Sequence, residues 1–141
     1  MTTIFLRVKH RFRERASEWF CAANLTQFGL SLLHPSQTFD SYAFAAFRNL
    51  GEQTTGVFFF LVGFTWFLGL IVNGARQSAT STIRLVCGAL GTVSYGLLGL
   101  GLLGSYVLTG IWSTGIGNYM LVSILGLYSL YWIAVDKKVN G

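Results

Sequence analysis

Residues 85–108 of this chain read LVCGALGTVSYGLLGLGLLGSYVL, and they contain no Lys, Arg, Asp or Glu. Two other runs share this property: TTGVFFFLVGFTWFLGLIV at 54–72 and IGNYMLVSILGLYSLYWIA at 116–134. A helix needs roughly 20 apolar residues to cross the hydrocarbon core of a bilayer. The runs are apolar throughout rather than on one face, which excludes a water-soluble bundle. The sequence therefore predicts an all-α integral membrane protein.

The composition and the charge distribution extend this prediction to a fourth span at residues 16–33. Only 11% of the 141 residues are charged, whereas soluble proteins carry about 25%. Of the ten basic residues, only Arg48 lies in the link between the first two spans, and the other nine lie in alternate segments of the chain. The positive-inside rule then predicts four spans with both termini in the cytoplasm.

The two ends of the chain flank the predicted transmembrane domain, which covers residues 16–134. Residues 1–15 form a basic amphipathic segment, and residues 135–141 form a cytoplasmic tail. We expect the basic segment to lie on anionic lipid headgroups; the alternative is an ordinary determinant of topology. Because the basic residues follow the membrane topology, no nucleic-acid partner is expected. The side chains predicted to contact headgroups are Arg7, Lys9, Arg11 and Arg15.

The first outer loop is predicted to contain a short interfacial helix. Asp40 is its candidate N-cap and Gly51 its candidate C-terminal glycine, because these residue types favour those positions. Three apolar side chains spaced by three residues would rest on the membrane interface: Phe44, Phe47 and Leu50.

The first span carries a polar stripe at helical spacing, formed by Ser17, Asn24, Gln27 and Ser31. Amides and hydroxyls are costly against hydrocarbon, so the stripe should face neighbouring helices or water. It either supplies hydrogen bonds between helices or lines a polar cavity or an oligomeric pore. On this prediction the opposite side of the helix faces lipid, and it consists of Leu25, Phe28 and Leu32.

The third span carries a seam of small residues over three turns: Gly88, Thr92, Gly96 and Gly99. Such seams allow helices to approach closely, so this face is predicted to contact another helix. Glu18 lies just inside the first span and can pair with Arg84 at matched depth, or with Arg15. A surface position is the favoured alternative for Glu18 and for Glu52. Neither acid is deep enough for a proton relay.

The sequence offers little chemistry for catalysis. Cys21 and Cys87 lie in separate spans without metal-binding spacing, and we interpret them as packing residues. His10 and His34 fall on opposite sides of the bilayer, so one chain cannot assemble a haem or zinc site from them. We expect no cofactor and no enzymatic activity.

Several features together resemble small inner-membrane proteins of tailed bacteriophages and prophages, some of which are described as holin-like. The features are the basic start, Glu18-Trp19, a loop with Pro35 and Phe39, and a link from Asn73-Gly74 to Arg84. The resemblance implies a location in a bacterial inner membrane and membrane permeabilisation through self-association. An accessory subunit packing on partner helices, lipids or pigments is the alternative, and a small transporter is a third. The expected partners are the bilayer and either further copies of the chain or a larger membrane complex.

Overall fold

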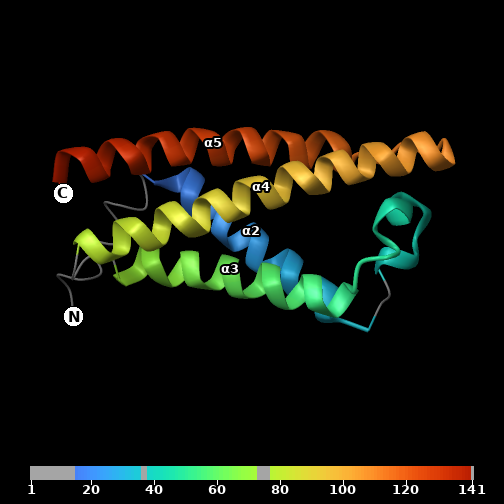
Figure 1. Cartoon of the computed structure of the whole chain (residues 1–141), viewed down its shortest axis with the longest axis horizontal. Coiled ribbons are helices and arrows are strands. Elements are labelled where there is room, and N and C mark those ends of the chain that lie inside the picture. The colour runs from blue at the N-terminus through green and yellow to red at the C-terminus, as the bar shows by residue number, and fades with distance from the viewer. Residues whose placement is uncertain (1–14, 36–37, 73–76, 141) are drawn as a thin grey trace.

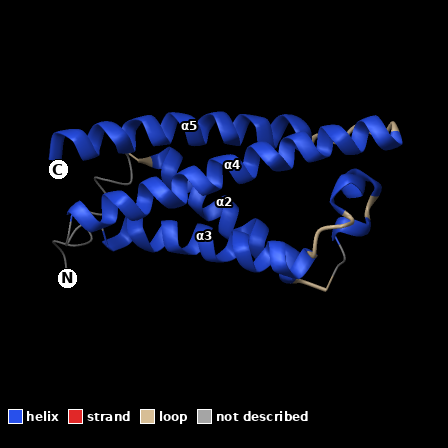
Figure 2. Ribbon diagram, viewed as in Figure 1, coloured by secondary structure: helices blue, strands red, loops and turns tan. Residues whose placement is uncertain are grey.

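The computed structural model describes residues 15–35, 38–72 and 77–140, and all regular structure there is helical (Figures 1 and 2). The prediction of an all-α protein is confirmed. The start of α2 and the end of α5 lie at the same end of the bundle (Figure 1). The elements are α2 (Ala16–Leu33), the 3₁₀ turns η1 (Thr38–Asp40) and η2 (Tyr42–Phe47), α3 (Glu52–Val72), α4 (Gln77–Thr109) and α5 (Gly115–Asn140).

Three of these helices are long and apolar enough to cross a membrane, which indicates a multi-pass membrane protein. They are α3, the Ser81–Thr109 part of α4 and the Gly115–Val135 part of α5. Helix α2 has the predicted bounds, but it is not among the three, because polar residues lower the mean hydropathy of this 18-residue helix. Helix α5 continues to Asn140, so most of the predicted tail is helical.

The helix ends follow from local sequence chemistry. His34 is extended, with φ −75° and ψ 142°, because a residue that precedes proline avoids the helical region. Pro35 therefore ends α2. At the end of α4, Gly110 has φ +73°, and its N–H donates to the carbonyl oxygen of Tyr106 at 2.7 Å. A glycine adopts this left-handed conformation without steric cost, which makes it a favourable helix terminator.

Close backbone contact joins α2 to α3. A Cβ on Gly63 would lie 2.6 Å from the backbone nitrogen of Thr26, and one on Gly29 would lie 2.8 Å from the Cα of Phe60. A Cβ on Gly56 would lie 3.1 Å from the carbonyl oxygen of Gly29, so this glycine completes the contact. The absence of side chains at these three glycines lets the two helices approach as membrane helices commonly do.

The core corrects the predicted orientation of α2. Leu25, Phe28 and Leu32 are buried among the other helices, so the prediction that they face lipid is wrong. The lipid environment explains the error: the interior and the surroundings of a membrane bundle are equally apolar. Hydropathy therefore does not reveal which apolar side of α2 turns inward. The glycine contacts with α3 decide it.

The outer loop also differs from its prediction. Two 3₁₀ turns replace the single interfacial helix, Ser41 rather than Asp40 precedes η2, and Phe44 has non-helical angles. Phe47 does not rest on the interface: it is buried, with its ring where a side chain on Gly101 would be. The space left by Gly101 accepts an aromatic ring, and the burial of that ring fixes the loop against α4.

Candidate functional site

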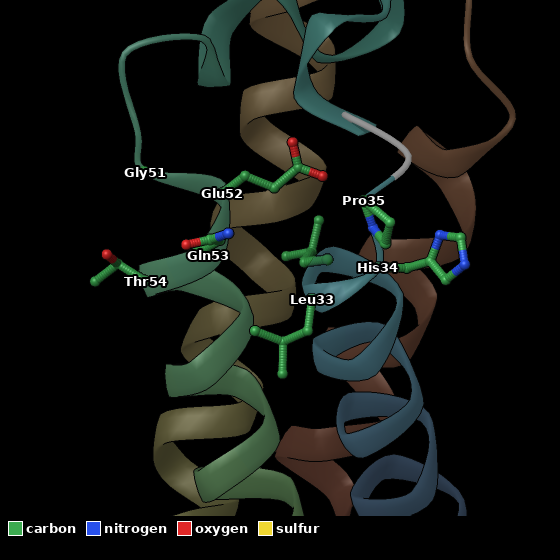
Figure 3. A pocket seen from close by; sticks show the side chains of 8 residues that line it. Leu33, His34, Pro35, Gly51, Glu52, Gln53 and Thr54 are labelled. Atoms are coloured by element: carbon green, nitrogen blue, oxygen red, sulfur yellow. The ribbon is translucent and has the colours of Figure 1, made fainter.

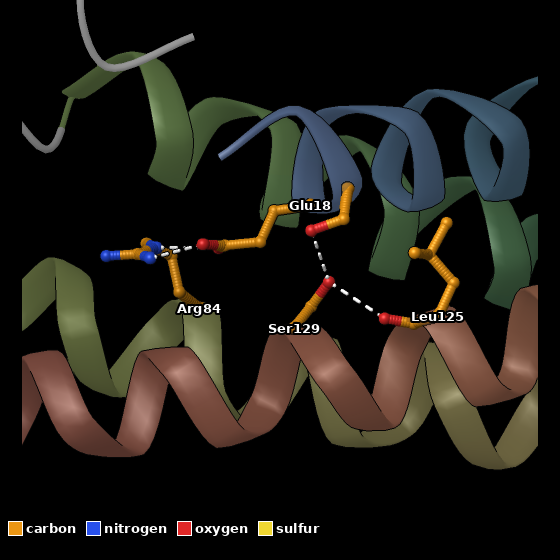
Figure 4. Close-up of polar contacts among 5 residues, drawn as sticks. Glu18, Arg84, Leu125 and Ser129 are labelled. Atoms are coloured by element: carbon orange, nitrogen blue, oxygen red, sulfur yellow. Dashed lines mark hydrogen bonds and ion pairs between the residues drawn. The ribbon is translucent and has the colours of Figure 1, made fainter. Parts of the chain in front are cut away.

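A buried ion pair joins the first turn of α2 to α4 (Figure 4). Arg84 Nε donates to Glu18 Oε2 at 2.9 Å, and Arg84 Nη2 lies 2.5 Å from Glu18 Oε1. Glu18 is only 2% exposed and Arg84 only 1%. The structure thus contains the Glu18–Arg84 pair, which the sequence suggested because the two residues lie at matched depth. The surface position favoured for Glu18 is wrong. Bidentate geometry offsets part of the cost of removing two charges from water.

Further polar contacts continue from this pair along the interior of the bundle. Ser129 Oγ lies 2.9 Å from Ser17 Oγ and donates to the carbonyl oxygen of Leu125 at 3.0 Å (Figure 4). One to two turns further along α2, the hydroxyl of Tyr95 lies 2.9 Å from the carbonyl oxygen of Cys21 and 3.1 Å from Asn24 Oδ1. These contacts link α2 to α4 and α5 and fix how the helices are rotated.

The centre of the bundle is apolar. Trp66 is fully buried, and its Nε1 has no hydrogen-bond acceptor among the described residues. Its ring lies against Gly88 and Gly91, so α4 presents a flat surface to it. Cys21 and Cys87 are buried free thiols. This region is suited to packing helices together.

The structure divides the predicted polar stripe of α2. Ser17 and Asn24 bond to α5 and α4 as described. Gln27 and Ser31 instead bond to each other, with Gln27 Nε2 donating to Ser31 Oγ at 3.1 Å, and Gln27 is exposed. Half of the stripe therefore joins helices within the chain, and half remains at the surface.

The predicted small-residue seam lies between α4 and its neighbours. Thr92 fits against Gly126 of α5, and the carbonyl oxygen of Thr92 accepts a hydrogen bond from Ser123 Oγ at 3.0 Å. Gly96 also faces Ser123, and Gly99 faces Met120. The remaining member, Gly88, faces Trp66 of α3 as well as α5. All four positions are therefore occupied by packing within one chain.

A groove of about 430 Å³ opens where α2 and α5 diverge. Because Asn24 bonds to Tyr95 through its oxygen, its side-chain nitrogen has no acceptor among the described residues. Asn118 is exposed, and no hydrogen bond of its side chain is found in the described part of the chain. The groove thus combines two carboxamides with apolar walls. Its lining residues are Phe20, Asn24, Asn118, Leu121, Val122 and Leu125.

A second cavity of about 430 Å³ lies where α2 ends and α3 begins (Figure 3). It includes His34, Pro35 and Glu52 in its lining. The carboxylate of Glu52 accepts hydrogen bonds from the backbone N–H groups of Thr38, at 2.7 Å, and Phe39, at 3.3 Å. Glu52 therefore anchors the outer loop to the first turn of α3, and the simplest role of the cavity is structural.

Some predicted positions are outside these sites. Arg7, Lys9 and Arg11 lie outside the described residues, and Arg15 stands directly before α2. Within residues 15–35, 38–72 and 77–140, no group of three or more His, Cys, Asp or Glu side chains is arranged to hold a metal ion.

Sequence reasoning missed Tyr95, Ser129, Trp66 and Asn118. The first two are polar side chains inside apolar spans, a pattern that in principle predicts a hydrogen-bond partner on another helix. Comparisons of the chain with known protein families, curated proteins and solved structures find no match.

Proposed function

We propose that this chain is a non-enzymatic protein of a bacterial inner membrane that crosses the bilayer four times, with both termini in the cytoplasm. The distribution of basic residues supports this topology. Helix α2, with 18 residues, is about 27 Å long at 1.5 Å per residue, slightly less than the roughly 30 Å thickness of the hydrocarbon core. The ion pair offsets the cost of including Glu18 in that span.

We propose further that the protein acts by self-association through the face that contains Asn24, Gln27 and Asn118. The observation that carries this proposal is a set of three carboxamides in a membrane-embedded bundle: Gln27 and Asn118 are exposed, and Asn24 is half-buried in the groove. A carboxamide that loses water without gaining a partner is costly. Each carboxamide is both a donor and an acceptor, so the same groups on a second copy can satisfy it.

Permeabilisation of the membrane by such assemblies, as in holin-like phage proteins, is the function we propose. Self-association along a face with carboxamides can give polar contacts or a polar path at the interface between copies. The small-residue seam of α4 is occupied within the chain, so the α2–α5 face is the better candidate surface for association.

The test is inducible expression in a bacterium, with membrane potential and cross-linked species followed over time. The variant N24L/Q27L/N118L replaces the three carboxamides, and N49L is a matched control at an exposed loop position. We expect wild type and N49L to form oligomers and to depolarise the membrane, and the triple variant to do neither. Oligomers and depolarisation that persist in the triple variant would refute the proposal.

An accessory subunit of a larger complex is a second candidate, favoured by the exposed apolar face of α5. Only 17% of the membrane-spanning part of α5 is buried within the chain, compared with 50% for α4. Purification from membranes distinguishes the two functions. A fixed foreign chain at constant ratio supports the subunit, and assemblies of this chain alone support self-association.

A further inference from the structure

The α4–α5 hairpin reaches beyond α2 and α3 at the end of the bundle opposite the C-terminus (Figure 1). We call this the distal end. Within it, Gly101 contacts Phe47, and Ser105 Oγ accepts a hydrogen bond from the backbone N–H of Ala46 at 2.9 Å. The outer loop thus packs against α4 at Gly101 and Ser105, and the helix continues beyond this contact to Thr109. From Gly101 to Thr109 the helix rises about 12 Å at 1.5 Å per residue.

The surface of this projecting hairpin is apolar. Val107 is 77% exposed, Leu108 72% and Trp112 62%, and Ile111 is also exposed. No charged residue occurs between positions 85 and 135. Large contiguous apolar surfaces are rare in contact with water, and Trp is enriched at the membrane interface. The tip therefore has the chemistry of a lipid-facing surface that ends at Trp112.

One side of the outer loop, which lies beside the hairpin, is a packed aromatic cluster. Phe39, Phe44 and Phe47 form a cluster with ring centroids 5.5 to 5.7 Å apart. Turn hydrogen bonds satisfy part of its backbone: Phe44 N–H donates to Ser41 at 3.0 Å, and Leu50 N–H to Phe47 at 2.8 Å. Irregular backbone is tolerated at membrane depth only where such contacts and the surrounding protein cover it.

The other side of the loop carries its polar groups. Asp40 and Arg48 are exposed, and the guanidinium of Arg48 lies 5.7 Å from the centroid of the Tyr42 ring. Charged and aromatic side chains of this kind suit the headgroup region of a bilayer. The loop is thus apolar on the side of the aromatic cluster and charged on the other side.

We propose that the distal end lies within the lipid leaflet farthest from the termini. The tip of the α4–α5 hairpin contacts hydrocarbon, and the η1–η2 loop is a re-entrant segment whose aromatic cluster takes the place of further turns of α2 and α3. Its partner is therefore lipid: acyl chains around Val107 and Leu108, and headgroups around Arg48. This inference rests on the proposed four-span topology, but it does not depend on self-association.

The test is the accessibility of nitroxides to oxygen, which concentrates in lipid, and to a water-soluble nickel complex. The chain is reconstituted in phospholipid nanodiscs with both cysteines replaced by alanine. Spin labels go on single cysteines at Leu108, at Ala46 in the loop, at Ile124 as the reference within α5, and at Asn49, next to Arg48, as the reference outside the hydrocarbon. Leu108, Ala46, Ile124 and Asn49 are all exposed on the protein, so labels there are compatible with folding.

We expect L108C and A46C to resemble I124C, with oxygen access and at least fivefold less nickel access than N49C. Nickel access at L108C equal to that at N49C would mean that the tip lies outside the hydrocarbon and would overturn the proposal. Low access to both reagents at L108C would mean a protein contact and would also overturn it. Lipid exposure of L108C together with water exposure of A46C would refute the re-entrant loop. Labelling of the same cysteines with an impermeant maleimide checks the result without a nitroxide.

Discussion

Breaking the Glu18–Arg84 ion pair should destabilise the protein more than any other single polar change described above. The variant E18L leaves a buried guanidinium without its carboxylate, and R84M leaves a buried carboxylate without its guanidinium. The two side chains are 3% and 1% exposed, respectively. Removal of one partner of a buried pair costs about 3–5 kcal/mol, roughly a hundredfold to several thousandfold in the folding equilibrium at 1.4 kcal/mol per tenfold.

The double variant separates the value of the pair from the cost of an isolated charge. E18L/R84M removes both charges and replaces the ion pair with an apolar contact between α2 and α4. Replacing a buried pair with apolar residues is often neutral or stabilising, so the double variant should be more stable than either single variant. The coupling energy of the cycle should be at least about 2 kcal/mol.

The assay is reversible unfolding in mixed micelles with increasing dodecyl sulfate, followed by circular dichroism and tryptophan fluorescence. R48M is the matched control, because it makes the same chemical change at an exposed arginine and should alter the free energy of unfolding by less than about 0.5 kcal/mol. If E18L and R84M each behave like R48M, or if their effects simply add in the double variant, the ion pair does not act as a unit.

Two further predictions concern apolar packing. Gly101→Leu should lower the free energy of unfolding by about 1–3 kcal/mol because its side chain needs the space of the Phe47 ring, whereas Gly104→Ala, with its nearest neighbour 3.8 Å away, should have little effect. Equal effects of these two variants in the same unfolding assay would show that the loop does not pack on α4. Trp66→Phe removes the buried N–H that lacks an acceptor, which offsets part of the cost of the cavity that the smaller ring leaves, so it should lower stability by no more than about 1 kcal/mol. Trp66→Ala should lower stability by about 3–5 kcal/mol, and a loss above about 2 kcal/mol in Trp66→Phe would indicate a partner for its Nε1.

Local sequence signals predicted the helices and most of their ends. The charge-free runs at 54–72, 85–108 and 116–134 are properties of single segments, and each corresponds to a helix of the structure. The end of α2 could also be predicted from the sequence, because Pro35 restricts the backbone around it. The loop at 38–51 was less predictable, since the fit of Phe47 over Gly101 depends on residues far apart in the chain.

The site was predictable only where a residue type had few partners to choose from. Glu18 had two candidate cations, and matched depth made Arg84 one of them, although a surface position was favoured; the structure selects Arg84. By contrast, Tyr95 and Ser129 lie within apolar runs, and nothing in those runs indicates that Tyr95 contacts Cys21 or that Ser129 contacts Ser17. The α2–α5 groove arises from the divergence of two helices, which no single segment encodes.

A helical protein with membrane-spanning segments could be inferred from the amino-acid sequence alone, because the cost of placing charge or unpaired backbone in hydrocarbon acts on each segment separately. Which side of each helix turns inward follows instead from the packing of the helices against one another. Lipid and protein interior are equally apolar, so burial follows the fit of glycines, aromatic rings and a few hydrogen bonds rather than hydropathy. Helix α2 is the clearest case: Leu25, Phe28 and Leu32 are buried, while Gln27 remains exposed.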